Sequence, residues 1–430
     1  MRTYTVREYG TLRPSDGKDD PSLADIEALL DAAARAGRRL AMPGEDRAEA
    51  ADDRVLRPAR GNGLRARGMV GVVVAGDVAL EILPKIDWAD EDQNRTQLVH
   101  MIHDALGLRL DLSPGAPIAT QDRTLLDAVI AAFVTRLEEA VRGGLARRYQ
   151  TVNDDLAVLR GRLDVRRQYT ALLTSPGRIA CTFDELLIDT ALNRCLKATL
   201  QLLHSHARSN GLRRSIVTLL NAFEGVRDRA HDFAAARRTL DRTNRRFRDL
   251  LVLAELFMNG AYQSTTRGPA GGLALLFDMP TLFERAIATA MRRALGPDAQ
   301  VKVEPQSHLM QGNAYVLKPD IVIHRPDLPP LVIDTKWKHL IDKPSSADAY
   351  QMLAYSHRFG ARDCVLLYPG QETCITATWK GHALSGSHQN SEWLLHQAHV
   401  PLQDYRDVPR ALRSLIEKTA RSSAPITASP

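Results

Sequence analysis

The 430-residue sequence has few cysteines and no long apolar segment. Its four cysteines, at positions 181, 195, 364 and 374, form no C-x-x-C pair, so we expect neither a structural zinc site nor a disulfide framework. No run of eighteen or more apolar residues occurs, and this excludes a membrane-spanning helix. The first residues also lack an apolar core of signal-peptide length. Together these absences favour a reducing, cytoplasmic environment.

A nucleotide-binding phosphate loop is also missing. The pattern G-x-x-x-x-G-K-[ST], whose backbone N–H groups and lysine hold nucleotide phosphates, does not occur in the sequence. We therefore do not expect this chain to be an NTP-driven motor itself.

The overall composition is that of a globular protein with more than one domain. Hydrophobic residues make up 44% and charged residues 25% of a chain that is longer than one ordinary domain. The formal net charge is +6, which suits association with nucleic acid but says nothing about the fold.

The pattern of apolar residues changes along the chain and predicts an α+β multidomain protein. Val70–Ala75 and Val78–Leu83 are β-branched runs joined by Gly76-Asp77, which is typical of a β-hairpin. Farther on, apolar residues recur four apart, as at Leu98 and Ile102, and this favours helices. The predicted regions are a β-rich N-terminal region (1–92), a helical middle (93–268), a mixed α/β core (269–405), and a terminal helix with a disordered tail (406–430).

Two aspartates and a lysine in the mixed α/β core have the pattern of a catalytic site. Asp334 and Lys336 are two apart at the end of the apolar run Leu331–Ile333, so they share one face of a predicted strand, while Thr335 points away and offers only its backbone carbonyl. Asp320 precedes this strand by a short connection that would bring both carboxylates together. Two such carboxylates suit Mg²⁺, with Mn²⁺ as a substitute.

The chemistry expected of this pattern is metal-dependent phosphodiester hydrolysis. The metal would polarise the phosphate and offset charge during an in-line displacement, and Lys336 would orient the attacking water or stabilise the developing charge. Glu284, on the inward side of a predicted helix, would add a third carboxylate, and Gln351 would contact the water or a phosphate. The alternative is that these residues are ordinary surface charges. Against it, Asp334 directly follows an apolar run, and a buried strand rarely ends in a charged residue without a functional or structural reason.

The order Glu, Pro-Asp, Asp-x-Lys, Gln resembles the PD-(D/E)xK nuclease superfamily. The residues around these positions are similar to those of the McrC family, the nuclease subunits of McrBC-type modification-dependent restriction systems. The matching pieces are Leu276-Phe277-Asp278-Met279, Leu282-Phe283-Glu284, Lys318-Pro319-Asp320-Ile321, Ile333-Asp334-Thr335-Lys336-Trp337-Lys338 and Tyr350-Gln351-Met352-Leu353-Ala354-Tyr355, with Glu81–Ile86, Leu159–Leu163, Asp184–Leu186 and Asn193–Lys197 upstream. The resemblance spans most of the chain.

The resemblance implies a catalytic role for Asp320, Asp334 and Lys336, which fall on the family's catalytic positions. It also implies a partner, because McrC-like chains work with a McrB-like AAA+ NTPase, usually driven by GTP, that recognises modified double-stranded DNA. The N-terminal region of such chains docks into the NTPase ring and stimulates hydrolysis. The resemblance therefore implies that residues 1–92 are the partner-docking region and that residues 269–405 form the PD-(D/E)xK nuclease domain. A separate motor agrees with the missing phosphate loop.

Weaker patterns concern arginines and one further lysine. Arg238, Arg242 and Arg245 recur at helical spacing and could follow a DNA backbone, or form a solvated face or a docking surface. Lys338 could touch phosphate. Arg160 and Arg162 could reach a partner's nucleotide as an arginine finger does, or belong to an ordinary turn.

The sequence thus predicts a Mg²⁺-dependent endonuclease subunit of a McrBC-like system that cuts DNA when a McrB-like NTPase engages it. Two alternatives stay open. One is a nuclease of repair or recombination that acts without a motor, and the other is a non-catalytic subunit that binds DNA or activates the NTPase.

Overall fold

The computed structural model describes most of the chain, and the described residues form two compact units. Unit 1 combines Met1–Leu125 with Ala261–Pro430, and unit 2 is Leu126–Gly260. The described residues are 2–15, 17, 20–35, 55–86, 89–107, 124–175, 177–228, 232–262, 272–296, 300–303, 305–308, 316–325, 328–338, 343–372, 374–381 and 393–423. Within them, no helix has the length and apolar character needed to cross a membrane.

The first sheet of unit 1 is built around the predicted hairpin. Its strand order is β1 (Arg2–Arg7), β6 (Val78–Leu83), β5 (Met69–Ala75), β11 (Gly272–Asp278) and β10 (Ala261–Tyr262). The antiparallel pairing of β5 with β6 confirms the hairpin at Gly76-Asp77. Strand β1 pairs with β6 in the parallel sense.

Strand β11 extends this first sheet, although it lies within the predicted nuclease region 269–405. It pairs antiparallel with β5, and Leu275 faces Val72 across the pair. A Cβ at Gly71 would lie 2.0 Å from the Leu275 carbonyl oxygen, so only glycine permits this approach. The boundaries of unit 1 therefore differ from those of the predicted regions. The spacing of apolar residues along the chain does not indicate which distant strands pair.

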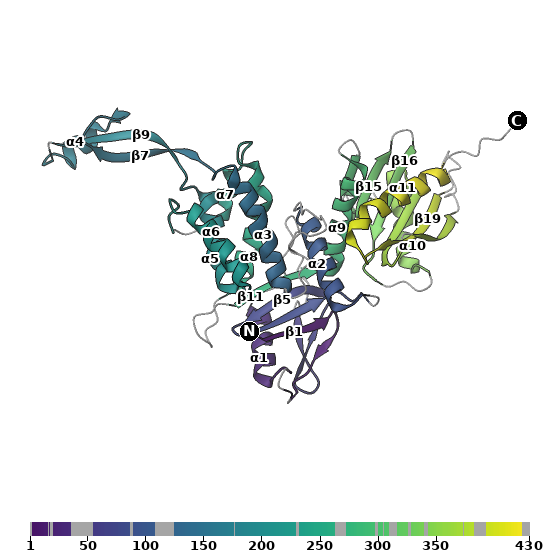
Figure 1. The fold of residues 1–430 in the computed structure, drawn as a ribbon. Coiled ribbons are helices and arrows are strands. Elements are labelled where there is room, and N and C mark those ends of the chain that lie inside the picture. Colours follow the sequence, from purple (N-terminus) through teal and green to yellow (C-terminus); the bar gives the residue numbers. More distant parts are fainter. Residues whose placement is uncertain are drawn as a thin grey trace. The chain divides into compact units, whose positions relative to one another are not determined.

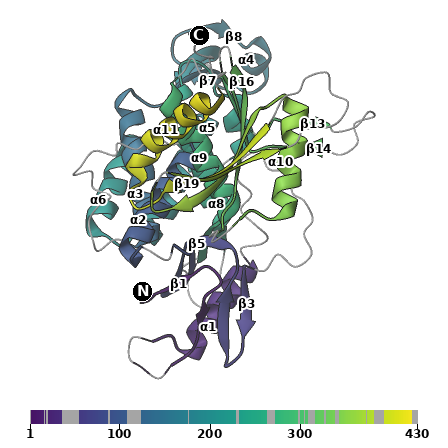
Figure 2. The ribbon, with the colours of Figure 1, turned by 90° about the vertical axis from the view of Figure 1, so that its right-hand side faces the viewer.

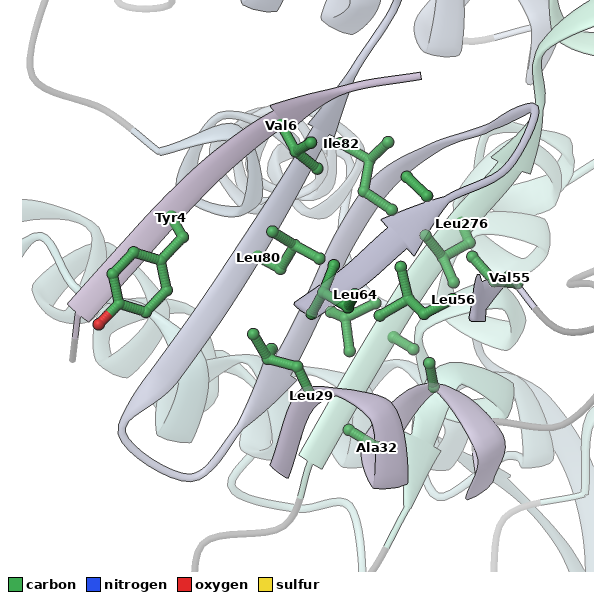
Figure 3. Packing of buried hydrophobic residues seen from close by; sticks show 14 of the residues in the cluster. Tyr4, Val6, Leu29, Ala32, Val55, Leu56, Leu64, Leu80, Ile82 and Leu276 are labelled. Carbon is green, nitrogen blue, oxygen red and sulfur yellow. The ribbon is translucent and has the colours of Figure 1, made fainter. Parts of the chain in front are cut away.

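Helix α1 (Leu23–Arg35) and a small sheet cover one face of this first sheet. The small sheet consists of β2 (Thr11–Leu12), β4 (Gly63–Ala66) and β3 (Leu56–Ala59). Figure 3 shows side chains of α1, β1, β3, β4, β6 and β11 meeting in one apolar core. Leu29, Leu64 and Leu80 are fully buried there, and such burial supplies the main stabilising free energy.

The second sheet of unit 1 has six strands of mixed direction. Its order is β12 (Gln300–Val303), β15 (Ile321–Arg325), β16 (Leu328–Thr335), β17 (Asp363–Gly370), β19 (Trp393–Pro401) and β18 (Cys374–Gly381). A further short pair is β13 (Ser307–His308) with β14 (Val316–Leu317). The sequence analysis missed β19, because His396, Gln397 and His399 interrupt its apolar run.

Helices cover both faces of the second sheet. Figure 2 shows α10 (Ser346–Phe359) on one face, and α9 (Met279–Leu295) with α11 (Val408–Ser423) on the other. The alternation of the strands explains this: Val332 and Leu366 pack with Met352 of α10, whereas Ile333 belongs to the opposite face. Parallel strands β16 and β17 need a crossover, which α10 provides. Helix α2 (Glu91–Ala105) also belongs to this unit and is linked to α9 by the Arg293–Asp104 ion pair of 2.6 Å.

Unit 2 is helical but carries a long β-hairpin that the sequence analysis did not predict. Its helices are α3 (Leu125–Arg142), α5 (Ala191–His206), α6 (Asn210–Ala222), α7 (Phe233–Arg238) and α8 (Arg248–Gly260). The hairpin joins β7 (Arg148–Leu156) to β9 (Ile179–Leu187), and Figure 1 shows α4 (Val165–Thr170) at its far end. The short strand β8 (Arg162–Leu163) also pairs with β9. The sequence did not predict β7 and β9, because the burial of their residues does not alternate between an apolar and a polar face.

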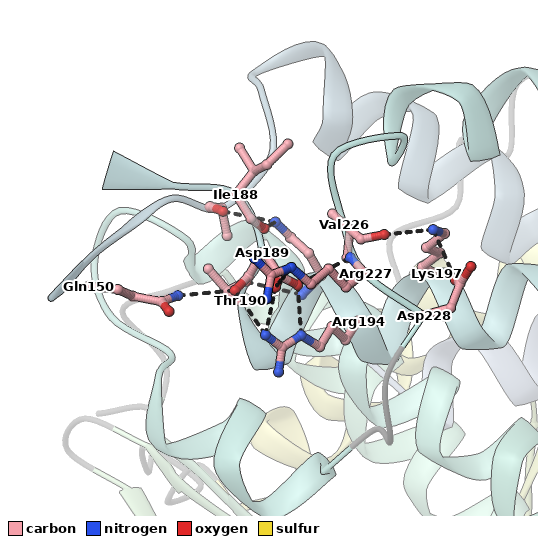
Figure 4. Close-up of polar contacts among 11 residues, drawn as sticks. Gln150, Ile188, Asp189, Thr190, Arg194, Lys197, Val226, Arg227 and Asp228 are labelled. Carbon is pink, nitrogen blue, oxygen red and sulfur yellow. Dashed lines mark hydrogen bonds and ion pairs between the residues drawn. The ribbon is translucent and has the colours of Figure 1, made fainter. Parts of the chain in front are cut away.

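A polar cluster holds the base of this hairpin against α5. The Asn193 side-chain amide donates to the carbonyls of Ala146 and Ile188, at 2.8 and 2.7 Å, and so bridges the two chain segments that lead into the hairpin. Next to it, Asp189 accepts from the Arg194 guanidinium at 2.7 Å (Figure 4). These contacts give the hairpin a defined base.

Candidate active site

Asp320 and Asp334 lie at the same end of the β15–β16 hairpin. Ile321 faces Ile333 across this antiparallel pair, so Asp320, just before β15, is placed beside the end of β16. This confirms the expectation that the short connection brings the two strands side by side. Asp334 is only 2% exposed, and its register opposite Leu366 places it on the face covered by α10.

Thr335 ties the two strands together at the site. Its backbone N–H and its hydroxyl both donate to Oδ2 of Asp320, at 2.6 and 2.7 Å. The expectation that Thr335 contributes only its carbonyl is therefore wrong. The alternation of side chains along β16 did not predict this contact. Asp320 lies just before β15, outside the strand, and so can contact Thr335 at the end of β16.

Lys336 reaches back to Asp334 and across to α10. Its Nζ lies 2.5 Å from Asp334 Oδ2 and donates to Gln351 Oε1 at 3.2 Å. Gln351 Nε2 then donates to the hydroxyl of Tyr355, which donates to the Lys318 carbonyl, at 2.8 and 3.0 Å. Lys336 therefore contacts both Asp334 and Gln351, as predicted residues of one site. Hydrogen bonds through Tyr355 connect Gln351 to Lys318, two residues before Asp320.

Burial and mutual repulsion shape the electrostatics of the two carboxylates. Burial, together with the charge of Asp334, raises the pKa of Asp320 to about 6. Burial also raises the pKa of Asp334, against the opposing effect of Lys336. Burial would lower the pKa of Lys336, but the nearby carboxylates hold it above its usual range. The lysine therefore stays charged between two aspartates that resist ionisation.

Glu284 is not gathered with the two aspartates into a three-residue metal group. Across the described ranges, no cluster of three or more His, Cys, Asp or Glu side chains could hold a metal ion. Glu284 lies on α9, where the neighbouring Phe283 ring packs 5.2 Å from the ring of Trp337. The helix therefore lies near the end of β16.

The donor set nevertheless fits a magnesium ion. Mg²⁺ is usually bound by one or two carboxylates, with water and substrate phosphate completing its shell. The raised pKa of Asp320 reflects burial and repulsion between two negative groups, and a divalent cation between them would relieve both. Asp320 and Asp334 are the residues that would hold it.

Asp348 is a site residue that sequence reasoning missed. Its carboxylate lies 2.7 Å from Lys338 Nζ and 4.0 Å from Lys336 Nζ. It also belongs to the capping box at the start of α10, in which Ser345 is the N-cap. That capping pattern was the available signal. Since Lys338 is paired with Asp348, a phosphate would have to compete for its charge.

The predicted arginine stripe is not continuous. Helix α7 ends at Arg238, and the carboxylate of Asp241 accepts from the N–H groups of Thr243 and Asn244 in a turn that breaks the helix. Arg242 therefore lies in that turn, and Arg245 begins a short 3₁₀ helix. The helical spacing of these arginines therefore does not correspond to one helix, because the turn formed by the Asp241 side chain replaces helical hydrogen bonding.

The arginines proposed as a finger both lie on the hairpin of unit 2. Arg160 donates to Glu185 at 3.2 Å and stacks over the Phe183 ring, with 4.1 Å from its guanidinium carbon to the ring centroid. Arg162 is exposed on β8. Arg160 is thus held by its own hairpin, whereas Arg162 faces solvent.

The fold and the site define a mixed α/β protein with a buried carboxylate, a half-buried carboxylate and a lysine at the end of the β15–β16 hairpin. Residues 64–369 match the model of a family described as McrBC 5-methylcytosine restriction system component. The chain belongs to this family. No curated relative matches the sequence.

Two solved structures are similar to this chain. One is the refined half-complex from a tetradecameric assembly of Thermococcus gammatolerans McrB AAA+ hexamers with bound McrC, with TM-score 0.69 and 22% identity over 97% of this chain and 100% of that chain. The other is the cryo-EM structure of the Thermococcus gammatolerans McrBC complex, with TM-score 0.52 and 24% identity over 69% of this chain and 88% of that chain. At these identities the likeness shows a shared fold.

Proposed function

We propose that this chain is the Mg²⁺-dependent DNA endonuclease subunit of a McrBC-like restriction system. It cuts modified double-stranded DNA when a McrB-like AAA+ NTPase engages it, and it stimulates NTP hydrolysis by that partner. The observation that carries the proposal is the contact of Lys336 with Asp334 beside Asp320. This is the set of groups that metal-dependent phosphodiester hydrolysis requires.

Each residue of the site has a separate task in the proposed reaction. Asp320 and Asp334 would hold Mg²⁺, which supplies Lewis-acid polarisation of the scissile phosphate when bound. The ammonium group of Lys336 lies next to Asp334 and stabilises negative charge that develops on the phosphate oxygens. Gln351 accepts a hydrogen bond from Lys336 Nζ and so restricts where the ammonium group lies.

Family membership and the similarity to McrC bound to McrB AAA+ hexamers support a AAA+ partner. GTP is the nucleotide that the resemblance to McrC implies for this partner. The surface of the described residues points to the hairpin of unit 2 as the contact. Eight of the fourteen exposed large hydrophobic residues belong to it, against two in the predicted docking region 1–92. The eight are Tyr149, Val158, Leu159, Leu163, Val165, Tyr169, Leu173 and Leu186. Such an exposed apolar set is typical of a protein interaction surface.

The experiment is cleavage of methylated plasmid by the full chain with its AAA+ partner, Mg²⁺ and GTP. Asp334→Ala should abolish cutting while leaving partner GTP hydrolysis stimulated, because the aspartate belongs to the nuclease site alone. Asp407→Ala, at a carboxylate 62% exposed on the same unit, is the matched control and should cut normally.

Each alternative makes a different prediction for this assay. Efficient cutting without the partner would favour a nuclease that acts alone. Equal results for Asp334→Ala and the unaltered chain would retire the catalytic assignment and leave a DNA-binding or NTPase-activating subunit.

A further inference from the structure

The four residues that follow Asp334 each bind a side chain from elsewhere in unit 1. Thr335 is bound to Asp320, Lys336 to Gln351, and Lys338 to Asp348. The fourth, Trp337, is anchored far away in sequence: its indole Nε1–H donates to Oε2 of Glu8 at 2.9 Å. Gln351 and Asp348 lie on α10 and Asp320 directly precedes β15 of the second sheet, whereas Glu8 follows β1 of the first sheet.

Glu8 is built into the first sheet and is not a surface carboxylate. It is 3% exposed, its backbone N–H donates to the Leu83 carbonyl at 2.9 Å, and its Oε2 also accepts from the Lys85 N–H at 3.2 Å. A buried carboxylate is costly unless its oxygens are hydrogen-bonded. Trp337 is one of the two donors that satisfy this oxygen, so the contact has a defined geometry.

A second connection reaches Trp337 from the same sheet. Strand β11 ends at Asp278, which is also the N-cap of α9 and accepts from the backbone N–H of Thr281. One turn farther along α9, Phe283 packs its ring against Trp337 with centroids 5.2 Å apart. The indole is therefore held at its N–H by the end of β1 and on its ring by the helix that continues β11.

We propose that Glu8 is a positioning residue for Lys336, acting through Trp337. By holding the indole, Glu8 fixes the backbone from which the adjacent lysine reaches Asp334, and the first sheet thereby controls the geometry of the nuclease site. This role rests on the proposed nuclease function. It also gives the protein a mechanical link through which a displacement of the first sheet changes the rate of cleavage.

The test uses the full chain with its AAA+ partner, Mg²⁺, GTP and methylated plasmid under single-turnover conditions. Glu8→Ala should lower the cleavage rate about 10- to 100-fold, as expected for small misplacements of a catalytic group. Glu8→Gln keeps an acceptor oxygen and should lose less. DNA affinity and stimulation of GTP hydrolysis should stay unchanged, whereas general damage to the fold would reduce all three.

Trp337→Phe provides the second arm, since it removes the indole N–H and keeps an aromatic ring against Phe283. It should slow cleavage to a similar extent, and the double variant with Glu8→Ala should be no slower than Glu8→Ala alone, because both remove one contact. In ¹⁵N-indole NMR spectra, the resonance that disappears in Trp337→Phe should shift in Glu8→Ala.

Two matched variants control for unrelated effects. Asp25→Asn alters another buried carboxylate beside the first sheet, one that accepts from Arg2 and Tyr4. Trp379→Phe makes the same aromatic change on β18. Both should leave the cleavage rate unchanged.

The outcomes separate the two proposals. If Asp334→Ala abolishes cutting but Glu8→Ala and Trp337→Phe cut at the normal rate, or if their effects add, the positioning role is overturned and the nuclease stands. If cutting survives Asp334→Ala, the nuclease assignment fails, and the positioning role fails with it.

Discussion

Thr335 binds one oxygen of Asp320 through two donors, its backbone N–H at 2.6 Å and its hydroxyl at 2.7 Å. The contact joins the residue before β15 to the last residue of β16, next to Asp334. It places Asp320, which belongs to no strand, at a defined position beside Asp334. Both hydrogen bonds favour the ionised carboxylate, and they lower the pKa of Asp320 against burial.

Thr335→Val should weaken the proposed site without unfolding the chain. The hydroxyl donor is lost while the backbone donor remains, so ionised Asp320 is stabilised by one hydrogen bond fewer. This costs about 1.5 kcal/mol, the low end for a charged acceptor, because the backbone N–H still binds the same oxygen. We expect cleavage to fall about tenfold at neutral pH and the acidic midpoint of the pH–rate profile to move upward. Thr335→Ser keeps the hydroxyl and should behave like the unaltered chain. An unchanged midpoint in the valine variant would contradict the role given to this contact.

The raised pKa of Asp320 predicts how stability depends on pH when no divalent cation is present. The folded-state pKa is about 6 and the ordinary value is 3.8, so folding favours the protonated form. The stability contributed by Asp320 is therefore fully present below the ordinary value and is lost as pH rises through about 6. Asp320→Asn cannot ionise and should gain thermal stability relative to the unaltered chain across this interval.

Thermal unfolding of both proteins over this pH range, with and without Mg²⁺, measures the effect. Mg²⁺ should raise the midpoint of the unaltered chain above about pH 6, where Asp320 is ionised, and should have little effect on Asp320→Asn. A difference between the two proteins that does not vary with pH would show that Asp320 titrates normally.

Substitutions at Gln351 and Tyr355 should reduce the cleavage rate to different extents. Gln351 contacts Lys336 directly, whereas Tyr355 acts one hydrogen bond farther away. Gln351→Ala should reduce cleavage by about 10- to 100-fold, and Tyr355→Phe by less, because the glutamine keeps its contact with the lysine. Single-turnover cleavage measures both, and Tyr350→Phe, at a tyrosine 72% exposed on the same helix, is the control. A larger loss in Tyr355→Phe would place the tyrosine, and not the glutamine, next to the reacting groups.

Arg325 and Asp363 should support the stability of the second sheet. They are 7% and 0% exposed, and the guanidinium lies 3.1 Å from the carboxylate, whose other oxygen lies 3.2 Å from His396 Nε2. Arg325→Met removes the cation from a buried carboxylate and should cost about 3–5 kcal/mol of unfolding free energy. Denaturant unfolding measures this loss. Arg410→Met, at an exposed pair with Asp407, should leave stability unchanged, and equal effects would contradict a buried network.

Gly161→Ala should impair engagement of the partner. Gly161 has φ of +69°, and an added Cβ would lie 2.5 Å from the Thr182 carbonyl oxygen and 2.6 Å from Phe183 Cβ, so β8 would be displaced from β9. Gly76→Ala has a similar φ of +60° with nothing within 4 Å, and it is the matched control. GTP hydrolysis by the AAA+ partner, titrated with each variant, should show weaker stimulation by Gly161→Ala. Stimulation that is the same for both variants would locate the docking surface elsewhere.

Local sequence predicted the elements whose signals lie within a few residues. β-branched runs around Gly76-Asp77 predicted the β5–β6 hairpin. The apolar run that ends in Asp334 marked the candidate site, because a buried strand seldom ends in charge without a reason. The aspartate–lysine pattern needs no long-range information, since residues two apart in a strand share a face.

Tertiary structure decided the features that depend on distant partners. Strand β11 joined the first sheet, β19 entered between β17 and β18, and Glu8 reached Trp337. Periodicity reports which residues are buried, but it does not say which distant strand buries them, because strand pairing and side-chain contacts arise only when the chain folds. The sequence by itself determined the residue types of the proposed site, and folding decided their neighbours, their raised pKa values and their link to the first sheet.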